Sequence, residues 1–263
     1  SVPALASGDF TSRDYFAEAG GAVTDAIYME MAVDGEEGWR AEARLLSAMM
    51  ADGRERLSGI IASCRPERPE GMEAWLEECA ALGVCGLRRV LHEMPDEMSR
   101  TETYRANVRR IGAAGLTYDL SFNDRQLDIA AELADACPDT RMVLNHCGVP
   151  RISVPEAFDG WRAGLRALAA RPNVWCKLSG ITAYCGPDQD AEQAIAPYVQ
   201  EVLEAFGPAR IVWGSDWPVV NLGAGLPGWI EITRRILARL SEAEASAISR
   251  ETARQVYRLP VGG

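Results

Sequence analysis

The sequence lacks the features that mark secreted, membrane-spanning or modular proteins. It contains no apolar run long enough to cross a bilayer, no signal-peptide pattern, and no linker, repeat or low-complexity segment. It also contains no Cys-x-x-Cys pair, and its 7 cysteines are an odd number, which fits unpaired structural thiols in a reducing compartment. We therefore expect a single domain over residues 1–263 in the cytoplasm, with no membrane partner.

Basic residues are outnumbered by acidic ones, with 27 Lys and Arg against 38 Asp and Glu and a formal net charge of −11. Nucleic acids and anionic membranes bind basic faces, so neither is an expected partner. A small-molecule substrate is compatible with this charge, even an anionic one, because a few arginines inside a cleft can dominate the local field. Composition leaves open whether the chain forms a homo-oligomer.

Hydrophobic periodicity and turn residues predict strands that alternate with helices. The predicted strands span residues 23–31, 57–64, 85–92, 116–122, 141–146, 173–179 and 210–215. The predicted helices span 11–19, 36–51, 70–82, 100–114, 124–136, 156–171, 190–206, 228–239 and 241–257. This alternation indicates parallel strands joined by helical crossovers, and hence an α/β fold of the (β/α)₈ barrel type. A closed barrel needs eight strands. We therefore expect a first strand before Ser1, or a barrel that is open or closed by other means.

Two polar residues follow predicted strands at the positions where barrels carry their chemistry. His146 comes at the end of the fifth strand, and Asp216 directly follows the last one. A core histidine satisfied by a backbone carbonyl and a turn aspartate are the structural alternatives. Their shared strand-end position favours a catalytic or metal-binding role for both residues.

Further charged residues lie on or near the predicted strands. Asp119 and Lys177 fall within strands, where a charge must be paired, so they form an ion pair or contact a substrate, with equal weight. Arg88 and Arg151 are candidates to bind a substrate carboxylate, against the alternative of solvated surface arginines. His92 is a candidate substrate contact, ligand or acid, or else part of an exposed loop.

Three segments resemble, in order, motifs of the amidohydrolase superfamily: residues 143–148 (VLNHCG), 173–180 (NVWCKLSG) and 212–218 (VWGSDWP). Residues 86–92 and 252–259 are also similar to this group. The branch concerned contains 2-pyrone-4,6-dicarboxylate lactonase, sugar-acid lactonases and related decarboxylases. The resemblance implies a barrel with its site at the carboxyl ends of the strands. It also implies that His146 is a metal ligand or substrate contact, and that Asp216 is the general base or a metal ligand.

The resemblance also implies a divalent metal, Zn²⁺ or Mn²⁺, but the His-x-His pair that the family places after its first strand is absent from this sequence. Because some members of the branch work without a metal, a metal-free enzyme is also compatible with the resemblance. The leading hypothesis is a hydrolase that opens the lactone ring of a sugar acid or of a dicarboxylate from aromatic breakdown. The alternatives are a metal-dependent decarboxylase that uses His92, and a truncated barrel that binds a small molecule without turnover.

Overall fold

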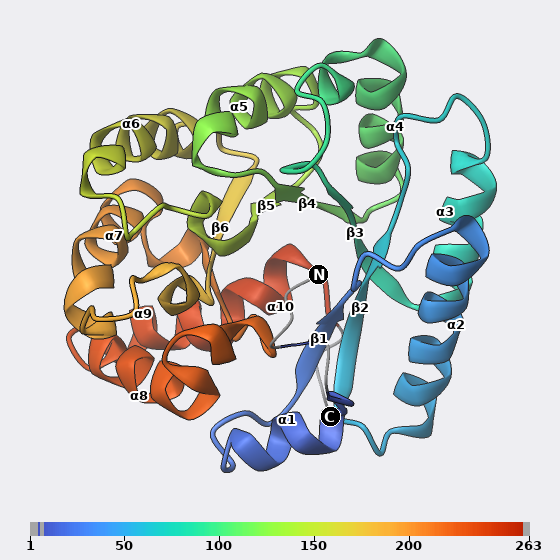
Figure 1. The fold of residues 1–263 in the computed structure, drawn as a ribbon. Coiled ribbons are helices and arrows are strands. Elements are labelled where there is room, and N and C mark those ends of the chain that lie inside the picture. The colour runs from blue at the N-terminus through green and yellow to red at the C-terminus, as the bar shows by residue number, and fades with distance from the viewer. Residues whose placement is uncertain (1–4, 6–7, 260–263) are drawn as a thin grey trace.

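The computed structural model describes residue 5 and residues 8–259, and its centre is one parallel sheet. Seven strands pair in chain order, and each is hydrogen-bonded to the next. They are β1 (Ala26–Met29), β2 (Leu57–Ser63), β3 (Val84–Val90), β4 (Thr117–Ser121), β5 (Met142–Leu144), β6 (Val174–Ser179) and β7 (Ile211–Gly214). The sheet curls, and most helices cover its outer face (Figure 1). The predicted fold is confirmed: this is a (β/α)₈-type barrel that lacks one strand in the described residues.

The described residues form ten α-helices, and those that join successive strands bury apolar side chains against the outside of the sheet. They are α1 (Ser12–Glu18), α2 (Glu36–Asp52), α3 (Met72–Leu82), α4 (Glu102–Ala113), α5 (Leu127–Ala136), α6 (Phe158–Ala169), α7 (Ala191–Phe206), α8 (Gly225–Leu237), α9 (Glu242–Ser246) and α10 (Thr252–Val256). Side-chain caps fix several starts: Thr101 accepts a hydrogen bond from the Tyr104 amide, and Asp190 accepts one from the Gln193 amide. The predicted helix 241–257 is instead divided by a π-helical turn, Ala247–Glu251.

The inside of the barrel has its own apolar cluster, which the last helix completes. Ile61, Val143 and Val212 point inward from β2, β5 and β7 and pack against Val256 and Tyr257. Figure 1 shows α10 inside the curl, whereas α8 lies outside it. Helix α10 and Tyr257 therefore fill part of the barrel interior that the side chains of the strands do not fill.

The curl is open between its first and last strands. In the part of the chain that the structure describes, β1 pairs only with β2, and β7 pairs only with β6. β1 and β7 are therefore the two edges of the sheet. Of the described helices, none combines the length and apolar character needed to cross a bilayer. All seven cysteines are unpaired, and five of them are buried.

Candidate active site

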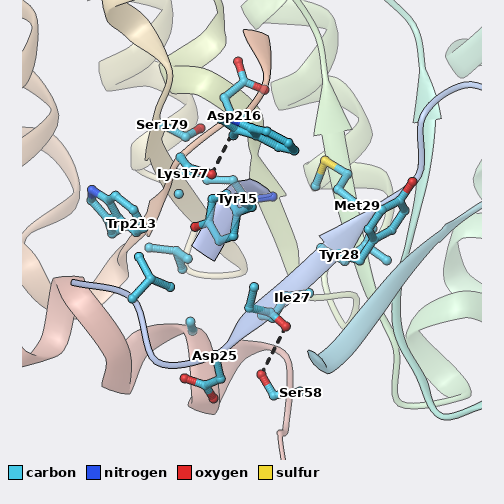
Figure 2. Close-up of a pocket in the computed structure, with 18 of the residues that line it drawn as sticks. Tyr15, Asp25, Ile27, Tyr28, Met29, Ser58, Lys177, Ser179, Trp213 and Asp216 are labelled. Atoms are coloured by element: carbon cyan, nitrogen blue, oxygen red, sulfur yellow. Dashed lines mark hydrogen bonds between the residues drawn. The ribbon is translucent and has the colours of Figure 1, made fainter. Parts of the chain in front are cut away.

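A cavity of about 1850 Å³ runs along the opening between β1 and β7 and reaches the carboxyl ends of the strands. Its polar wall contains Glu30, Arg88, His92, His146, Lys177, Ser179 and Asp216. Figure 2 shows Lys177, Ser179 and Asp216 grouped at one end, whereas Asp25 and Ser58 lie at the other. Five of the seven site residues predicted from the sequence therefore line one cavity.

Asp216 lies directly after β7 in a backbone conformation that is uncommon for a side-chain-bearing residue, with φ +57°. The next residue, Trp217, packs against the rings of Phe10 and Tyr15, so that α1 and the segment before it support this turn. Gly180 leaves room for the carboxylate, because a β-carbon there would lie 2.4 Å from the Asp216 side chain. The fold thus holds Asp216 at a fixed place on the cavity wall.

Burial raises the pKa of Asp216 to about 7, even though the positive charges of Arg88 and Lys177 act to lower it. Within residues 8–259 no hydrogen bond reaches its carboxylate, and the nearest ring nitrogen, His146 Nδ1, is 3.5 Å from Oδ2. A mostly buried carboxylate without donors is a better proton acceptor than an ordinary aspartate. Asp216 is therefore suited to general-base catalysis near neutral pH.

The sequence predicts His146 as the last residue of the strand 141–146, but β5 ends at Leu144 and His146 lies in the turn that follows. His146, Cys147 and Val149 all have positive φ values, a strained arrangement for residues other than glycine. The Trp161 indole donates a hydrogen bond of 2.8 Å to the Cys147 carbonyl and so secures the turn. His146 Nδ1 lies 2.8 Å from Ser179 Oγ. Burial, followed by the charge of Lys177, holds the pKa of His146 well below its ordinary value, so the ring is neutral.

Lys177 and Asp119 form a buried ion pair inside the barrel. The Lys177 ammonium donates to Asp119 Oδ2 at 2.5 Å and to Asn145 Oδ1 at 3.0 Å. The Tyr257 hydroxyl also lies 3.0 Å from Asp119 Oδ1. Asp119 is 0% exposed and is not part of the cavity wall, whereas Lys177 is. The structure thus favours the ion-pair interpretation for Asp119 and leaves Lys177 able to face a ligand.

Arg88 and His92 also reach the cavity. The Arg88 guanidinium donates from Nε to Glu30 Oε1 and from one amino group to the Glu30 carbonyl, both at 2.6 Å. In the described part of the chain its other amino group has no partner and is available to an anion. His92 Nδ1 lies 3.3 Å from Ser121 Oγ, and burial lowers the pKa of its ring.

Arg151 does not lie in this site. It is not among the residues that line the cavity, its side chain is 59% exposed, and its Nε donates to Asp124 at 2.6 Å. This arginine corresponds to the solvated-surface alternative.

The side chains present do not complete a metal site. Among the described residues there is no group of three or more His, Cys, Asp and Glu side chains placed to hold an ion. His146 and Asp216 supply two potential ligands, and the Nδ1 atom of His146 is already engaged with Ser179. Zinc sites in proteins use at least three protein ligands. These two residues therefore do not fit Zn²⁺ or Mn²⁺ by themselves.

Four further residues contact the predicted site residues and were not predicted from the sequence: Ser179, Asn145, Gly180 and Tyr257. Ser179 has a recognisable signal, because it lies two residues after Lys177 on one strand and so faces the same side. Tyr257 has none, since its contact with Asp119 joins residues 138 positions apart.

A family model described as Amidohydrolase matches residues 1–259. L-fucono-1,5-lactonase of Burkholderia multivorans is 29% identical over 95% of this chain and 88% of its own length. A 2-pyrone-4,6-dicarboxylate hydrolase of Comamonas testosteroni is 26% identical over 59% of this chain and 52% of its own. A crystal structure of a Burkholderia multivorans amidohydrolase with bound HEPES has a TM-score of 0.88 and 28% identity, covering 96% of this chain and 90% of that one. A second crystal form with bound zinc has a TM-score of 0.85 and 28% identity, covering 96% and 89%.

Proposed function

The chain belongs to the amidohydrolase family and is a hydrolase, and on that premise we propose that it opens the lactone ring of a small carboxylated substrate, with Asp216 as general base. The observation that carries this proposal is the environment of Asp216. It is a buried carboxylate on a cavity wall, with no hydrogen-bond donor in the described residues and a pKa raised by burial to about 7. Such a group accepts a proton from water at neutral pH.

The proposed reaction begins when a water molecule attacks the ester carbon of the ring and gives its proton to Asp216. The carbonyl oxygen becomes negative in this step. Lys177 lies close enough to Asp216 for their charges to interact, and it supplies a positive charge for that oxygen. Collapse of the tetrahedral intermediate breaks the bond between the ester carbon and the ring oxygen. Protonated Asp216 returns the proton to that oxygen, and the product is the open hydroxy acid.

The remaining polar residues suit the recognition of an anionic substrate. The free amino group of Arg88 can bind a carboxylate, while Glu30 holds the rest of the guanidinium in place. Neutral His146 can orient the water or the ring, because an uncharged imidazole both donates and accepts. His92 is a second neutral hydrogen-bonding group on the same wall. A dicarboxylate lactone, of the kind named for the Comamonas relative, fits this set through its carboxylates. A sugar-acid lactone, of the kind named for the Burkholderia relative, has its carboxyl group in the ring ester and would be bound through its hydroxyl groups.

A divalent metal would polarise the substrate carbonyl in a family member that binds one. Because His146 and Asp216 alone do not complete a site, the proposed steps use only side chains of this chain. The decarboxylase alternative is less well supported for the same reason, although His92 does line the cavity. A non-catalytic barrel is not favoured, since the family assignment and the lactonase relatives indicate an enzyme.

The proposal is tested by incubating the protein with a panel of lactones and measuring the acid that is released by titration at constant pH. The panel should contain sugar-acid 1,4- and 1,5-lactones, 2-pyrone-4,6-dicarboxylate, and lactones of the same ring sizes with neither hydroxyl nor carboxyl substituents. We expect enzyme-dependent hydrolysis of at least one polyhydroxylated or carboxylated lactone, and slower turnover of the lactones that carry neither kind of substituent. No acid release from any member, with carbon dioxide released from an aromatic carboxylate instead, would favour the decarboxylase.

A further inference from the structure

Lys177 is the only lysine in the sequence, in which every other basic side chain apart from the two histidines is an arginine. It lies on β6 and is almost completely buried inside the barrel. An ammonium group has three donors, and in the described residues two of them are used, by Asp119 and Asn145. The third is left for the cavity, whose wall includes this side chain. The position of the ammonium therefore depends on how firmly Asp119 is held.

We propose that Tyr257, from the C-terminal end of the chain, is a positioning residue that holds Lys177 against the substrate through Asp119. The inference rests on the proposed function, because it assigns Lys177 to the carbonyl oxygen of the lactone. The Tyr257 hydroxyl lies 3.0 and 3.1 Å from the two oxygens of Asp119. Its ring lies 5.7 Å from the Lys177 ammonium, within the range of a cation–π contact.

The hydroxyl is the part of Tyr257 that packing alone does not require. The ring is buried with Val256 in the inner apolar cluster, where a phenylalanine would fill the same space. A buried hydroxyl needs a partner, and here it reaches past the cluster to a carboxylate. Donation from Tyr257 stabilises Asp119 as an anion, and the anion in turn holds the ammonium in place.

Other charges around Lys177 make this support necessary. Burial and the positive charge of Arg88 on β3 act against a charged Lys177, while Asp119 on β4 and Asp216 after β7 act in its favour. His146 and Cys85 also face it, and neither is positively charged. Asp119 is the one carboxylate among these groups in direct contact with the ammonium. A substitution at Tyr257 should therefore alter the contact between Lys177 and the substrate by loosening Asp119.

The proposal is tested with Tyr257→Phe, and with Val256→Ala as a control that disturbs the same buried helix but keeps the hydroxyl. Loss of a hydrogen bond to a charged group is expected to lower kcat about 10-fold. KM should change less than about twofold, since the contact between Lys177 and the oxygen strengthens only in the transition state. In an Asp119→Asn background, Tyr257→Phe should cause almost no further loss, because the path through the carboxylate is already broken. Equal effects of Tyr257→Phe in both backgrounds, or an equal loss in Val256→Ala, would overturn it.

A second measurement does not depend on turnover. Because Lys177 is the only lysine, protein grown with lysine labelled with ¹⁵N at the side-chain nitrogen gives a single lysine ammonium resonance. We expect Tyr257→Phe to shift this resonance and to speed its exchange with water, and Val256→Ala to leave it in place. An unchanged resonance in Tyr257→Phe contradicts the positioning role even if the protein hydrolyses lactones. A changed resonance in a protein with no lactonase activity supports the contact and counts against the proposed function alone.

Discussion

Asp119 and Asp216 lie on the same barrel, on or just after parallel strands, and both are largely removed from water. Their surroundings differ. Asp119 receives hydrogen bonds from Lys177 and Tyr257 and is shut off from the cavity. Asp216 faces the cavity, receives no hydrogen bond from the described residues, and has a pKa raised by burial to about 7.

The difference teaches how one fold uses two buried carboxylates for separate purposes. A buried charge that is fully paired is part of the structure, and removing either partner exposes the other to the cost of desolvation. A buried carboxyl without donors is instead held in a high-energy ionised state, which makes it a base at the expense of stability. Variants of Asp119 and Asp216 separate these two roles.

The largest expected effect is on turnover in Asp216→Asn. The amide cannot accept the proton from water, so kcat should fall by a factor on the order of 10³, at the upper part of what a general base contributes. Initial rates on the best lactone of the panel measure this. Asp119→Asn should retain more activity than Asp216→Asn, and the reverse order would invalidate the assignment of roles.

The two variants should differ in the opposite sense when stability is measured. Asp119→Asn leaves the Lys177 ammonium buried without its counter-ion, which should cost about 3 kcal/mol and lower Tm by roughly 10 °C. For Asp216, a pKa raised to about 7 means that wild-type stability falls as pH rises from about 4 to 7, since the folded state binds the proton more tightly. Asp216→Asn escapes this loss and should unfold at a higher temperature than wild type at pH 8. The measurement is the Tm of both variants and of the wild type at pH 5 and pH 8. The same change in Tm for the two variants would contradict the separate roles of Asp119 and Asp216.

A smaller effect is expected from crowding Asp216 without changing it. In Gly180→Ala the new β-carbon would meet the Asp216 side chain at 2.4 Å, so the carboxylate must move. Displacement of a reacting group by about 1 Å is expected to lower kcat/KM about 10- to 100-fold. Gly207→Ala is the matched control, since Gly207 also has a positive φ, +68°, and a β-carbon added there meets nothing within 4 Å. Equal activity of the two variants would show that the position of Asp216 is not critical.

The smallest expected effect is that of a chelator. With two potential ligands in the described residues, dialysis against a chelator should change kcat/KM less than about twofold. Elemental analysis of the dialysed protein alongside the assay provides the measurement. Loss of turnover that Zn²⁺ or Mn²⁺ restores would mean that the metal belongs to the reaction after all.

Much of the fold and part of the site could be predicted from the sequence. The seven strands can be located because apolar runs alternate with helical periodicity, and Asp216 and His146 because each follows such a run. The boundaries are less certain: β1 covers only Ala26–Met29 of the predicted 23–31, although the Glu30 amide still donates a hydrogen bond to the Ile61 carbonyl of β2. Arg151 shows a different limit, because nothing local in a sequence tells whether a loop arginine faces a cleft or solvent.

The central claim, that Asp216 is the base, is tested most directly by the pH dependence of kcat/KM for the lactone hydrolysed fastest. Because burial raises the pKa of Asp216 to about 7, kcat/KM should rise about tenfold per unit below that pH and level off above it. The small residual activity of Asp216→Asn should lack this rise. A wild-type profile that stays flat between pH 5 and 8, or the same rise in Asp216→Asn, would contradict the account.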